Sequence, residues 1–597
     1  TFSNVKGGFS FFKAVGHPLV VAKGYRLIAE LKGRVAVFDP LGFVSSFAAL
    51  YDFSSVAITN VFVQDIERVG ESILGHSAQP VTDLACAEVD TVLIVAFDAV
   101  RMMDQIRHLL PDGAVLTCLD GMRLDDNMIT NARVYLDPIN FTTNFAFFRD
   151  SDGHHTRLTT VNYWHGYGAG DVRLWLQLID SNGDVLANWE EPIVSTPAGI
   201  IIDSRALRRR FSLGDFVGQL FMHVIGAKGH DVVKYALDTY GDSVNVLSCT
   251  HDANAWPSDR FAGLPAPRAG ETVTLWVQNS HPCPIPAGGV GLNVMGSEDV
   301  VWLGQPIAPF ASYALDVTAL LPDTHWPQQI EVRAGKHFVR PRYEITLANE
   351  RSRISHVNVE RCDLAPDPRI TEIGSLLGKG YILPAPVLPS EFFRISVLPT
   401  PMATSQETLP VMAAVVHRDG REVARHKFGC LERAHSSVLE LDDLLPSGNE
   451  LGGKFGHVEL TYDFADGGEA DGWLHAIFRY EDRRTGHTAE TSFGAHMFNS
   501  VLVYRGEPQS YSGPAPGLST RLFLRLGTGI ADDTFCHLIY PASTPWHAAS
   551  ATTLTLYDNG GGELVTREVA IPCGGSLLWY GSETFGADEI ARAGEGA

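Results

Sequence analysis

Cysteine is scarce in this chain of 597 residues, which has eight cysteines. They stand at positions 86, 118, 249, 283, 362, 430, 536 and 573 and form no C-x-x-C pair, which argues against a zinc ribbon or a thioredoxin-like centre. Sparse cysteines are typical of free thiols in a reducing compartment, so we predict a cytoplasmic location. A Cys249–Cys283 disulfide is the less favoured alternative. Because the sequence begins with Thr1 and not with Met, a secreted or cell-surface location stays open.

Long apolar runs and excess positive charge are also missing. The longest uncharged apolar strand-like run covers residues 91–97, far short of the ~18 residues that a membrane-spanning helix needs, so we predict no membrane insertion. The 69 acidic side chains outnumber the 46 basic ones, which leaves a formal net charge of −23. A polyphosphate such as duplex DNA would be repelled, so we expect no nucleic-acid partner.

The usual catalytic signatures are absent as well. The sequence has no G-x-S-x-G elbow, no P-loop and no H-E-x-x-H motif, so hydrolase, kinase and metalloprotease functions lack their anchors. The composition, with 45% hydrophobic and 19% charged residues, supports buried cores and excludes a wholly disordered chain. The 57 glycines and 33 prolines favour many strands and turns. At roughly 100–200 residues per domain, the length predicts three to five domains.

Predicted strands and helices alternate in the N-terminal quarter, as in a parallel α/β unit. Apolar spacing predicts a helical segment over residues 1–32 and an amphipathic helix over 98–110. Short apolar strands are predicted at 34–38, 56–63, 91–97 and 114–119. Strands that alternate with helices at this spacing favour a small parallel sheet, which we place at residues 33–149.

Residues 33–135 resemble a half-Rossmann domain. The segments Pro80-Val-Thr-Asp83 and Asp90-Thr-Val-Leu-Ile94 are similar to parts of the small nucleotide-binding lobes that precede sugar-modifying transferase domains. The resemblance implies a cofactor site at the first strand–helix turn, with Asp39 and Gly42 as its residues. A phosphate-binding turn needs several glycines. This turn has one glycine and a carboxylate, so we predict a degenerate domain with a structural role.

A repeated hairpin pattern replaces the helices from about residue 150. One copy reads Leu174-Trp-Leu-Gln-Leu-Ile-Asp180 and turns at Ser-Asn-Gly183, and others recur near 415–425 and 554–565, with a more divergent copy near 272–277. Asp-Gly and Asn-Gly turns between apolar runs are strong hairpin signals. The predicted fold class is therefore α/β plus mainly β: the degenerate Rossmann-like domain followed by about four tandem antiparallel, Ig-like β-sandwiches. Their predicted ranges are 150–264, 265–385, 386–512 and 513–597, the last expected to be truncated.

Residues that could bind a divalent metal ion gather in the first predicted sandwich. His230, Asp231, His251 and Asp252 would offer imidazole and carboxylate ligands if their strands pair. Adjacent residues of a strand point to opposite faces, however, and Asp residues in turns also satisfy backbone donors. We therefore favour ordinary turns over a metal site. A second patch, around His475, is interpreted in the same way as a set of sandwich-surface side chains.

Aromatic side chains beside polar groups indicate a candidate glycan site. The five residues singled out for ligand binding are Trp164, His165, Trp256, Trp326 and Trp546. Exposed rings that are flanked by hydrogen-bonding groups can stack on sugar faces. The alternative, which we favour, is that these rings fill cores between sheets or domains, where most tryptophans lie.

These features favour a non-catalytic multidomain scaffold or recognition protein over an enzyme. Its tandem sandwiches would bind a glycan or protein partner, and edges of the array could build a homo-oligomer. The alternative is an enzyme, either related to sugar nucleotides through the N-terminal domain or dependent on a metal ion at His251 and Asp252. Fold class alone does not decide between these functions.

Overall fold

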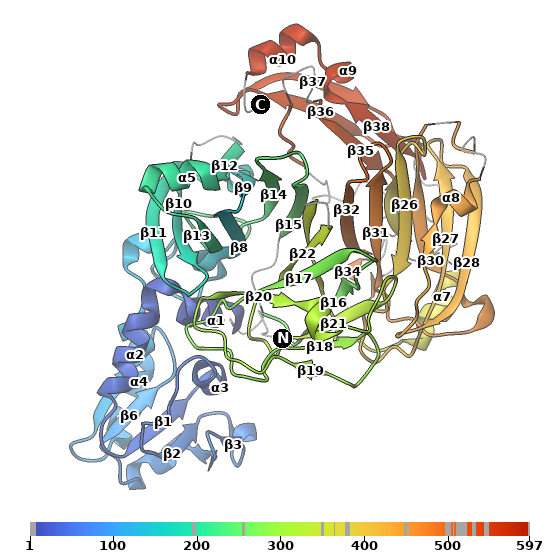
Figure 1. The fold of residues 1–597 in the computed structure, drawn as a ribbon. Helices are drawn as coiled ribbons and strands as arrows, with labels where there is room; N and C mark the ends of the chain where they lie inside the picture. Colours follow the sequence, from blue (N-terminus) through green and yellow to red (C-terminus); the bar gives the residue numbers. More distant parts are fainter. Residues whose placement is uncertain are drawn as a thin grey trace.

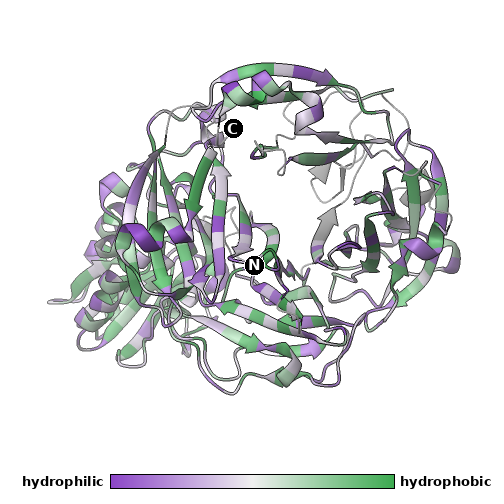
Figure 2. Ribbon diagram, turned by 45° about the horizontal axis from the view of Figure 1, so that its top comes forward, coloured by the Kyte–Doolittle hydropathy of each residue, from purple (hydrophilic) through white to green (hydrophobic). Residues whose placement is uncertain are grey.

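The computed structural model has a small α/β unit at its N-terminal end, followed by antiparallel β-sheets (Figure 1). The chain is mainly β, as the sequence predicts, and its sheets are consistent with β-sandwich domains. The sheet units follow one another around an arc that ends in the C-terminal hairpins, and the α/β unit lies outside that arc (Figure 2). The structure describes residues 8–193, 199–252, 257–347, 351–362, 364–376, 382–446, 450–452, 454–495, 503–504, 507–508, 522–527, 533–541 and 548–594.

A five-stranded sheet of order β5-β2-β1-β6-β7, in which every neighbouring pair is parallel, forms the α/β unit. The strands are β1 (Val35–Asp39), β2 (Ile58–Val63), β5 (Gln79–Pro80), β6 (Thr91–Ile94) and β7 (Val115–Cys118). The helices are α1 (Gly8–Gly16), α2 (Val21–Glu30), α3 (Val44–Ala48) and α4 (Val100–Ile106). A small hairpin of β3 (Ser72–Ile73) and β4 (His76–Ser77) lies beside them.

The central strand β1 is buried on both faces, as expected for a parallel strand with helices on either side. Val35 and Val37 face a core shared with α1, α2 and α3. Ala36 and Phe38 face a second core shared with α4. The continuous apolar run at residues 34–38 is therefore explained by the burial of both faces of β1.

The first sandwich is one continuous sheet that folds over into two layers. Strands β8 and β9 pair only at their hairpin end, so β11-β10-β13-β8 forms one layer and β12-β9-β14-β15 the other. Trp164, Leu176 and Leu220 lie in the core of this sandwich. The strands are β8 (Thr142–Ser151), β9 (His154–Val161), β10 (Val172–Asp180), β11 (Val185–Ile193), β12 (Gly199–Asp203), β13 (Phe216–Ile225), β14 (Tyr235–Gly241) and β15 (Leu247–Asp252), with helix α5 (Ser204–Phe211).

The second sandwich consists of a sheet of order β19-β18-β21-β16-β24 and a sheet of order β20-β17-β22-β23. Phe261, Leu275 and Ile330 belong to the core of this sandwich. Its strands are β16 (Arg260–Pro265), β17 (Glu271–Gln278), β18 (Gly291–Val294), β19 (Val301–Trp302), β20 (Ser312–Asp316), β21 (Gln329–Arg333), β22 (Arg342–Leu347), β23 (Ser352–His356) and β24 (Asn358–Val359), with helix α6 (Val317–Leu320).

The third sandwich pairs a sheet of order β25-β30-β27-β28 with one of order β29-β26-β31-β32. Its strands are β25 (Ile382–Val387), β26 (Phe393–Pro399), β27 (Thr408–His417), β28 (Glu422–Glu432), β29 (Leu439–Glu440), β30 (Gly456–Tyr462), β31 (Leu474–Asp482) and β32 (Thr488–Ala495), with helices α7 (Pro368–Leu376) and α8 (Leu441–Leu444). Asp419 and Gly420 form the turn between β27 and β28, where Gly420 has φ +90°. The sequence predicts this hairpin.

Short hairpins and two helices make up the C-terminal end. The elements are β33 (Val503–Tyr504), β34 (Glu507–Pro508), β35 (Phe535–Ile539), β36 (Thr552–Tyr557), β37 (Glu563–Val569), β38 (Ser576–Tyr580), α9 (Gly581–Thr584) and α10 (Ala587–Ala593). They pack against the third sandwich: the Ser576 N–H donates to the Arg418 carbonyl at 3.1 Å. All eight cysteines are free thiols, so Cys249 and Cys283 form no disulfide. Within the described ranges, no helix combines the length and the apolar character needed to cross a membrane.

Buried ion pairs cross the junctions between the sandwiches. Arg149 on β8 donates two hydrogen bonds of 3.1 and 3.0 Å to the carboxylate of Glu344 on β22. Arg353 on β23 donates twice, at 2.8 Å each, to Glu490 on β32. These side chains are at most 8% exposed. Since a paired guanidinium and carboxylate are planar and directional, each of the two ion pairs fixes the orientation of one sandwich relative to the next.

The N-terminal helices are fixed to the first sandwich by buried polar contacts. Nε2 of His17, at the end of α1, lies 3.1 Å from Nδ1 of His223 on β13. Nε2 of His223 in turn donates to the Asn140 carbonyl at 3.0 Å. Because burial lowers the pKa of both histidines, the pair is neutral near pH 7.

Candidate functional site

At the predicted cofactor turn after β1, the carboxylate of Asp39 forms hydrogen bonds inside the protein. Oδ1 of Asp39 accepts the Phe43 N–H at 2.8 Å, and Oδ2 pairs with Arg68 at 3.0 Å. The Asp39 side chain is 1% exposed. Gly42 has φ +80°, a left-handed conformation that glycine adopts without strain. One backbone donor of this turn, the Phe43 N–H, and the Arg68 guanidinium group are therefore bonded to Asp39.

The carboxylate of Asp120 forms similar hydrogen bonds beyond the carboxyl end of the neighbouring strand β6. At the start of α4, Asp120 accepts the Asp98 N–H at 2.7 Å and the Ala99 N–H at 3.0 Å. In open α/β sheets, ligands bind outside the carboxyl ends of the strands, where helix N-termini offer free N–H groups. Here the carboxyl ends of β1 and β6 both carry an internal anion in that place. Asp39 and Asp120 thus each bind backbone N–H groups at these two strand ends.

The predicted metal ligands fall into two separate places. Asp252 is buried and pairs with Arg342 of the second sandwich at 3.0 Å. His251 points to the other face of β15, where its ring lies edge-on to His356. His230 lies in the loop before β14 and contacts Tyr167 instead. In the part of the chain that the structure describes, no three His, Cys, Asp or Glu side chains are grouped to hold a metal ion.

The predicted ligand-binding aromatics also differ in their surroundings. Trp164 is 1% exposed and lies in the core of the first sandwich, which leaves neither ring face open. Trp326 lies between two guanidinium groups, with Arg479 3.7 Å and Arg268 4.7 Å from the ring centroid. His165 is exposed at the surface. Trp256 and Trp546 lie outside the described residues.

An exposed tyrosine beside Trp164 and His165 forms the site that we single out. Tyr167 ends the 3-10 helix η9 (Tyr163–Tyr167) and is 54% exposed. Its hydroxyl lies 2.9 Å from Nε2 of His230, and the two rings are perpendicular. We call Tyr167, Gly229 and His230 the Tyr167 platform. The structure thus brings the turn that carries Trp164 and His165 against the loop that carries His230.

Gly229 supports one face of the Tyr167 ring. A Cβ atom at Gly229 would lie 2.4, 2.5 and 2.8 Å from Cγ, Cδ1 and Cδ2 of Tyr167. Since the three distances are similar, the glycine lies over the face of the ring and not beyond its edge. The backbone can approach this closely only because glycine has no side chain. Tyr167 nevertheless remains 54% exposed.

The loop that carries Gly229 and His230 is pinned by side chains from several elements. The His230 carbonyl accepts from Trp164 Nε1 and from Thr142 Oγ1, each at 3.3 Å. The Asp231 carbonyl accepts from Lys13 Nζ on α1 at 2.6 Å. Tyr163 donates its hydroxyl proton to the Val232 carbonyl. The Tyr167 platform is therefore held in position before any ligand arrives.

Charged residues of both signs flank Gly229 and His230 in the loop that contacts the Tyr167 ring. Burial, and secondarily the charge of Lys234, lower the pKa of His230, so its ring is neutral near pH 7. The Asp231 carboxylate is 34% exposed and lies 3.6 Å from Lys13. Lys228 is exposed and donates to the Gly168 carbonyl at 2.7 Å. These groups supply donors and acceptors beside an aromatic surface.

Tyr167 and Gly229 are the two platform residues that sequence reasoning missed. Both stand in motifs that the sequence analysis singles out, but as neighbours of the chosen residues. The sequence signal for Tyr167 is its place at the end of the turn that begins after the buried Trp164, where the following residues are exposed. No local signal pairs it with Gly229, because their contact joins segments 62 positions apart.

Comparisons with known proteins leave the function open. No protein-family model and no curated protein matches this chain. Among solved structures, the native conformation of E. coli alpha-2-macroglobulin aligns at 10% identity over 74% of this chain and 27% of that one, with a TM-score of 0.09. Dimeric latent PorU from Porphyromonas gingivalis aligns at 9% identity over 92% of this chain and 61% of that one, with a TM-score of 0.10. These TM-scores are too low to indicate a common fold.

Proposed function

We propose that this chain is a non-catalytic recognition scaffold whose Tyr167 platform binds a glycan. The observation that carries this proposal is the Tyr167 ring, which packs on Gly229 and still leaves the residue 54% exposed. A bound sugar ring would place its C–H face on the Tyr167 ring. Its hydroxyl groups would bond to Lys228 and Asp231, which flank Gly229 and His230 in the sequence.

Preorganisation supports the same proposal. A ligand loses less affinity to conformational ordering when the protein side chains are already fixed. The Tyr167 ring is fixed at its hydroxyl by His230 and at its face by Gly229. The loop beneath is fixed by Lys13 and Trp164. Such rigidity has no evident structural purpose at an exposed ring, and it suits a binding surface.

The buried ion pairs support the scaffold part of the proposal. Pairs such as Arg149–Glu344 and Arg353–Glu490 contribute little net stability compared with apolar contacts, but they set geometry. They hold the sandwiches in one arrangement along the arc. A fixed arrangement of this kind presents binding surfaces at defined spacing.

We further propose that the α/β unit is a degenerate Rossmann-like domain and that the sandwiches are Ig-like repeats. Counted by parallel strand, the sheet order is 3-2-1-4-5, the start of the doubly wound order. Asp39 and Asp120 occupy the positions where its phosphate donors would be. These contacts support a structural role for the unit and give no support to the sugar-nucleotide enzyme.

A glycan array tests the proposal. The full chain is passed over immobilised oligosaccharides and polysaccharides, together with Tyr167→Ala and Phe392→Ala. Phe392 is a matched control because it is 37% exposed and its ring is covered by Arg484. We expect binding of at least one glycan, a loss of about tenfold or more in Tyr167→Ala, which corresponds to about 1.4 kcal/mol, and no change in Phe392→Ala. No glycan bound, or equal binding by all three proteins, would contradict the proposal.

A further inference from the structure

Among the residues that the structure describes, the outer edge of the parallel sheet has no neighbouring strand. β7 pairs with β6 alone and ends the order β5-β2-β1-β6-β7. The N–H groups of Val115 and Leu119 donate inward, to the carbonyls of Asp90 and Ala96. Because backbone groups alternate along a strand, the N–H and C=O of Leu116 and the N–H of Cys118 point outward, while the Cys118 carbonyl caps the 3-10 helix Leu119–Met122. This is an open edge of the kind that accepts another strand.

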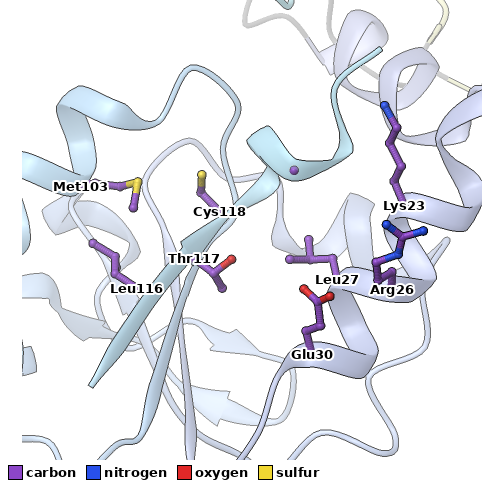
Figure 3. Close-up of a pocket in the computed structure, with 9 residues that line it drawn as sticks. Lys23, Arg26, Leu27, Glu30, Met103, Leu116, Thr117 and Cys118 are labelled. Atoms are coloured by element: carbon purple, nitrogen blue, oxygen red, sulfur yellow. The ribbon is translucent and has the colours of Figure 1, made fainter. Parts of the chain in front are cut away.

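A hollow of about 260 Å³ lies along this edge (Figure 3). Three consecutive residues of β7, Leu116, Thr117 and Cys118, line it. Successive strand residues point to opposite faces of a sheet. A hollow that touches all three therefore lies beside the strand and not above one face of it.

Helices wall this hollow from both faces of the sheet. On one side, Met103 of α4 packs in the core that includes Leu116 and Cys118. On the other side, Leu27 and Glu30 of α2 lie across from Thr117 (Figure 3). The hollow, which we call the slot, therefore lies between α2 on one face of the sheet and α4 on the other.

The charge of the slot favours an acidic occupant. Lys23 and Arg26 line it with Glu30, which gives one net positive charge in a chain of net charge −23. Lys23 is bonded to the Arg123 carbonyl at 2.7 Å and to Asp125. Arg26 is exposed, and no described residue forms a salt bridge or a side-chain hydrogen bond with it. Arg26 is therefore the cation available to a ligand.

We propose that this slot binds an extended peptide of a partner protein by strand addition to β7. The peptide would exchange backbone hydrogen bonds with Leu116 and accept one from the Cys118 N–H, as in β-augmentation. Alternate apolar side chains would contact Met103 and Leu27, and an acidic group would pair with Arg26. Val115, which is 62% exposed, would be covered. This site is independent of the Tyr167 platform and goes beyond the proposed glycan binding.

Peptide selection on the full chain tests this proposal. A phage-displayed library of random dodecapeptides is the probe, panned against the native chain, Leu116→Pro and Leu116→Val. Proline at position 116 removes one outward N–H and leaves the ladder to β6 intact, whereas valine keeps the N–H. We expect enriched peptides that carry an acidic residue and bind Leu116→Val as they bind the native chain. Leu116→Pro should bind them at least tenfold more weakly.

Backbone methylation of a selected peptide gives a readout that does not depend on any variant. In strand addition, N-methyl groups at alternate positions abolish binding and those between them are tolerated. A period of two would support the proposal even where Leu116→Pro fails to fold. No enriched peptide, equal effects of methylation at all positions, or equal binding to Leu116→Pro would overturn it. Self-association of the native chain that Leu116→Pro abolishes would assign the slot to a second copy and would also overturn it.

Discussion

The guanidinium group of Arg353 binds the carboxylate of Glu490 through Nε and Nη2, each at 2.8 Å, across the junction between the second and third sandwiches. Arg479 lies 2.7 Å from the same carboxylate, and Glu271 lies 2.9 Å from Arg353. Two arginines lower the pKa of Glu490 to about 2 although burial opposes this. Two arginines and two glutamates meet here, so their charges balance, and each side chain is at most 4% exposed.

Removing one partner of this junction should destabilise the third sandwich. In Glu490→Ala two buried guanidinium groups lose their carboxylate, which costs about 3–5 kcal/mol. Hydrogen exchange in β23 and β31 should accelerate. The control is Arg484→Ala, because Arg484 pairs with Asp482 at the exposed surface and such pairs contribute roughly 0–1 kcal/mol. Equal exchange in the two variants would show that the buried network does not hold the junction.

A side chain at position 229 should disable the Tyr167 platform. In Gly229→Ala the new Cβ would lie 2.4 Å from the ring, so Tyr167 must move and glycan binding should fall about as far as in Tyr167→Ala, tenfold or more. The control is Gly270→Ala. Gly270 has the same φ of +81°, and its Cβ would meet no atom within 4 Å. Binding is measured on the glycan array, and a Gly229→Ala chain that binds normally would contradict the role of the glycine.

Buried histidines should destabilise the protein as the pH falls below about 6.5. Burial lowers the pKa of His223 to about 4, against a value of 6.5 in the unfolded chain. Between these values the unfolded state binds the extra proton, so stability is complete above pH 6.5 and is lost as the pH falls toward 4. His223 alone accounts for about 3 kcal/mol over this window. The melting temperature of His223→Gln should depend less steeply on pH than that of the native chain, and equal slopes would contradict this assignment.

Ionisation of Glu360 should destabilise the fold as the pH rises, which is the opposite of the histidine effect. Burial, and secondarily the charge of Glu331, raise its pKa to about 7 from 4.5, while Arg433 opposes the shift. The folded state therefore holds a proton that the unfolded state releases, and stability falls as the pH rises from 4.5 through 7. Glu360→Gln should melt higher than the native chain at pH 8 and about equally at pH 4.5. A variant that melts lower at pH 8 would contradict this.

Nucleotides should not stabilise the α/β unit. Asp39 and Asp120 occupy the N–H groups that a pyrophosphate would use. A ligand at a hundred times its Kd stabilises the folded state by about 2.7 kcal/mol. Thermal melting with millimolar nicotinamide dinucleotide or nucleotide sugar should therefore show no shift, and a rise in the melting temperature would restore the enzyme alternative. Melting without nucleotide serves as the reference.

Local sequence patterns predict the mainly β architecture and the parallel sheet because both depend on neighbouring residues. The apolar run at 34–38 predicts a strand buried on both faces, and β1 has that burial. The turn at Asp419 and Gly420 predicts its hairpin for the same reason. The absence of a membrane-spanning helix in the described part of the chain also agrees with the sequence. The carboxylate of Asp39 already marks a poor phosphate turn, although its partner Arg68 lies outside the motif.

The sites depend on contacts between distant segments, which the sequence pattern does not encode. His475 is interpreted from the sequence as a surface residue, yet it is 2% exposed because β31 is covered at the junction of the sandwiches. Asp252 has an arginine of another sandwich as its partner, which no spacing indicates. Tyr167 and Gly229 likewise meet only when η9 and the loop before β14 fold together.

Titration calorimetry with the tightest glycan from the array is the most direct test of the recognition function. The native chain, Tyr167→Ala and Phe392→Ala are titrated under identical conditions, and unchanged melting temperatures verify that all three are folded. We predict an association constant at least tenfold lower for Tyr167→Ala, about 1.4 kcal/mol, and an unchanged constant for Phe392→Ala. Equal constants for the native chain and Tyr167→Ala would contradict the Tyr167 platform as the glycan-binding surface.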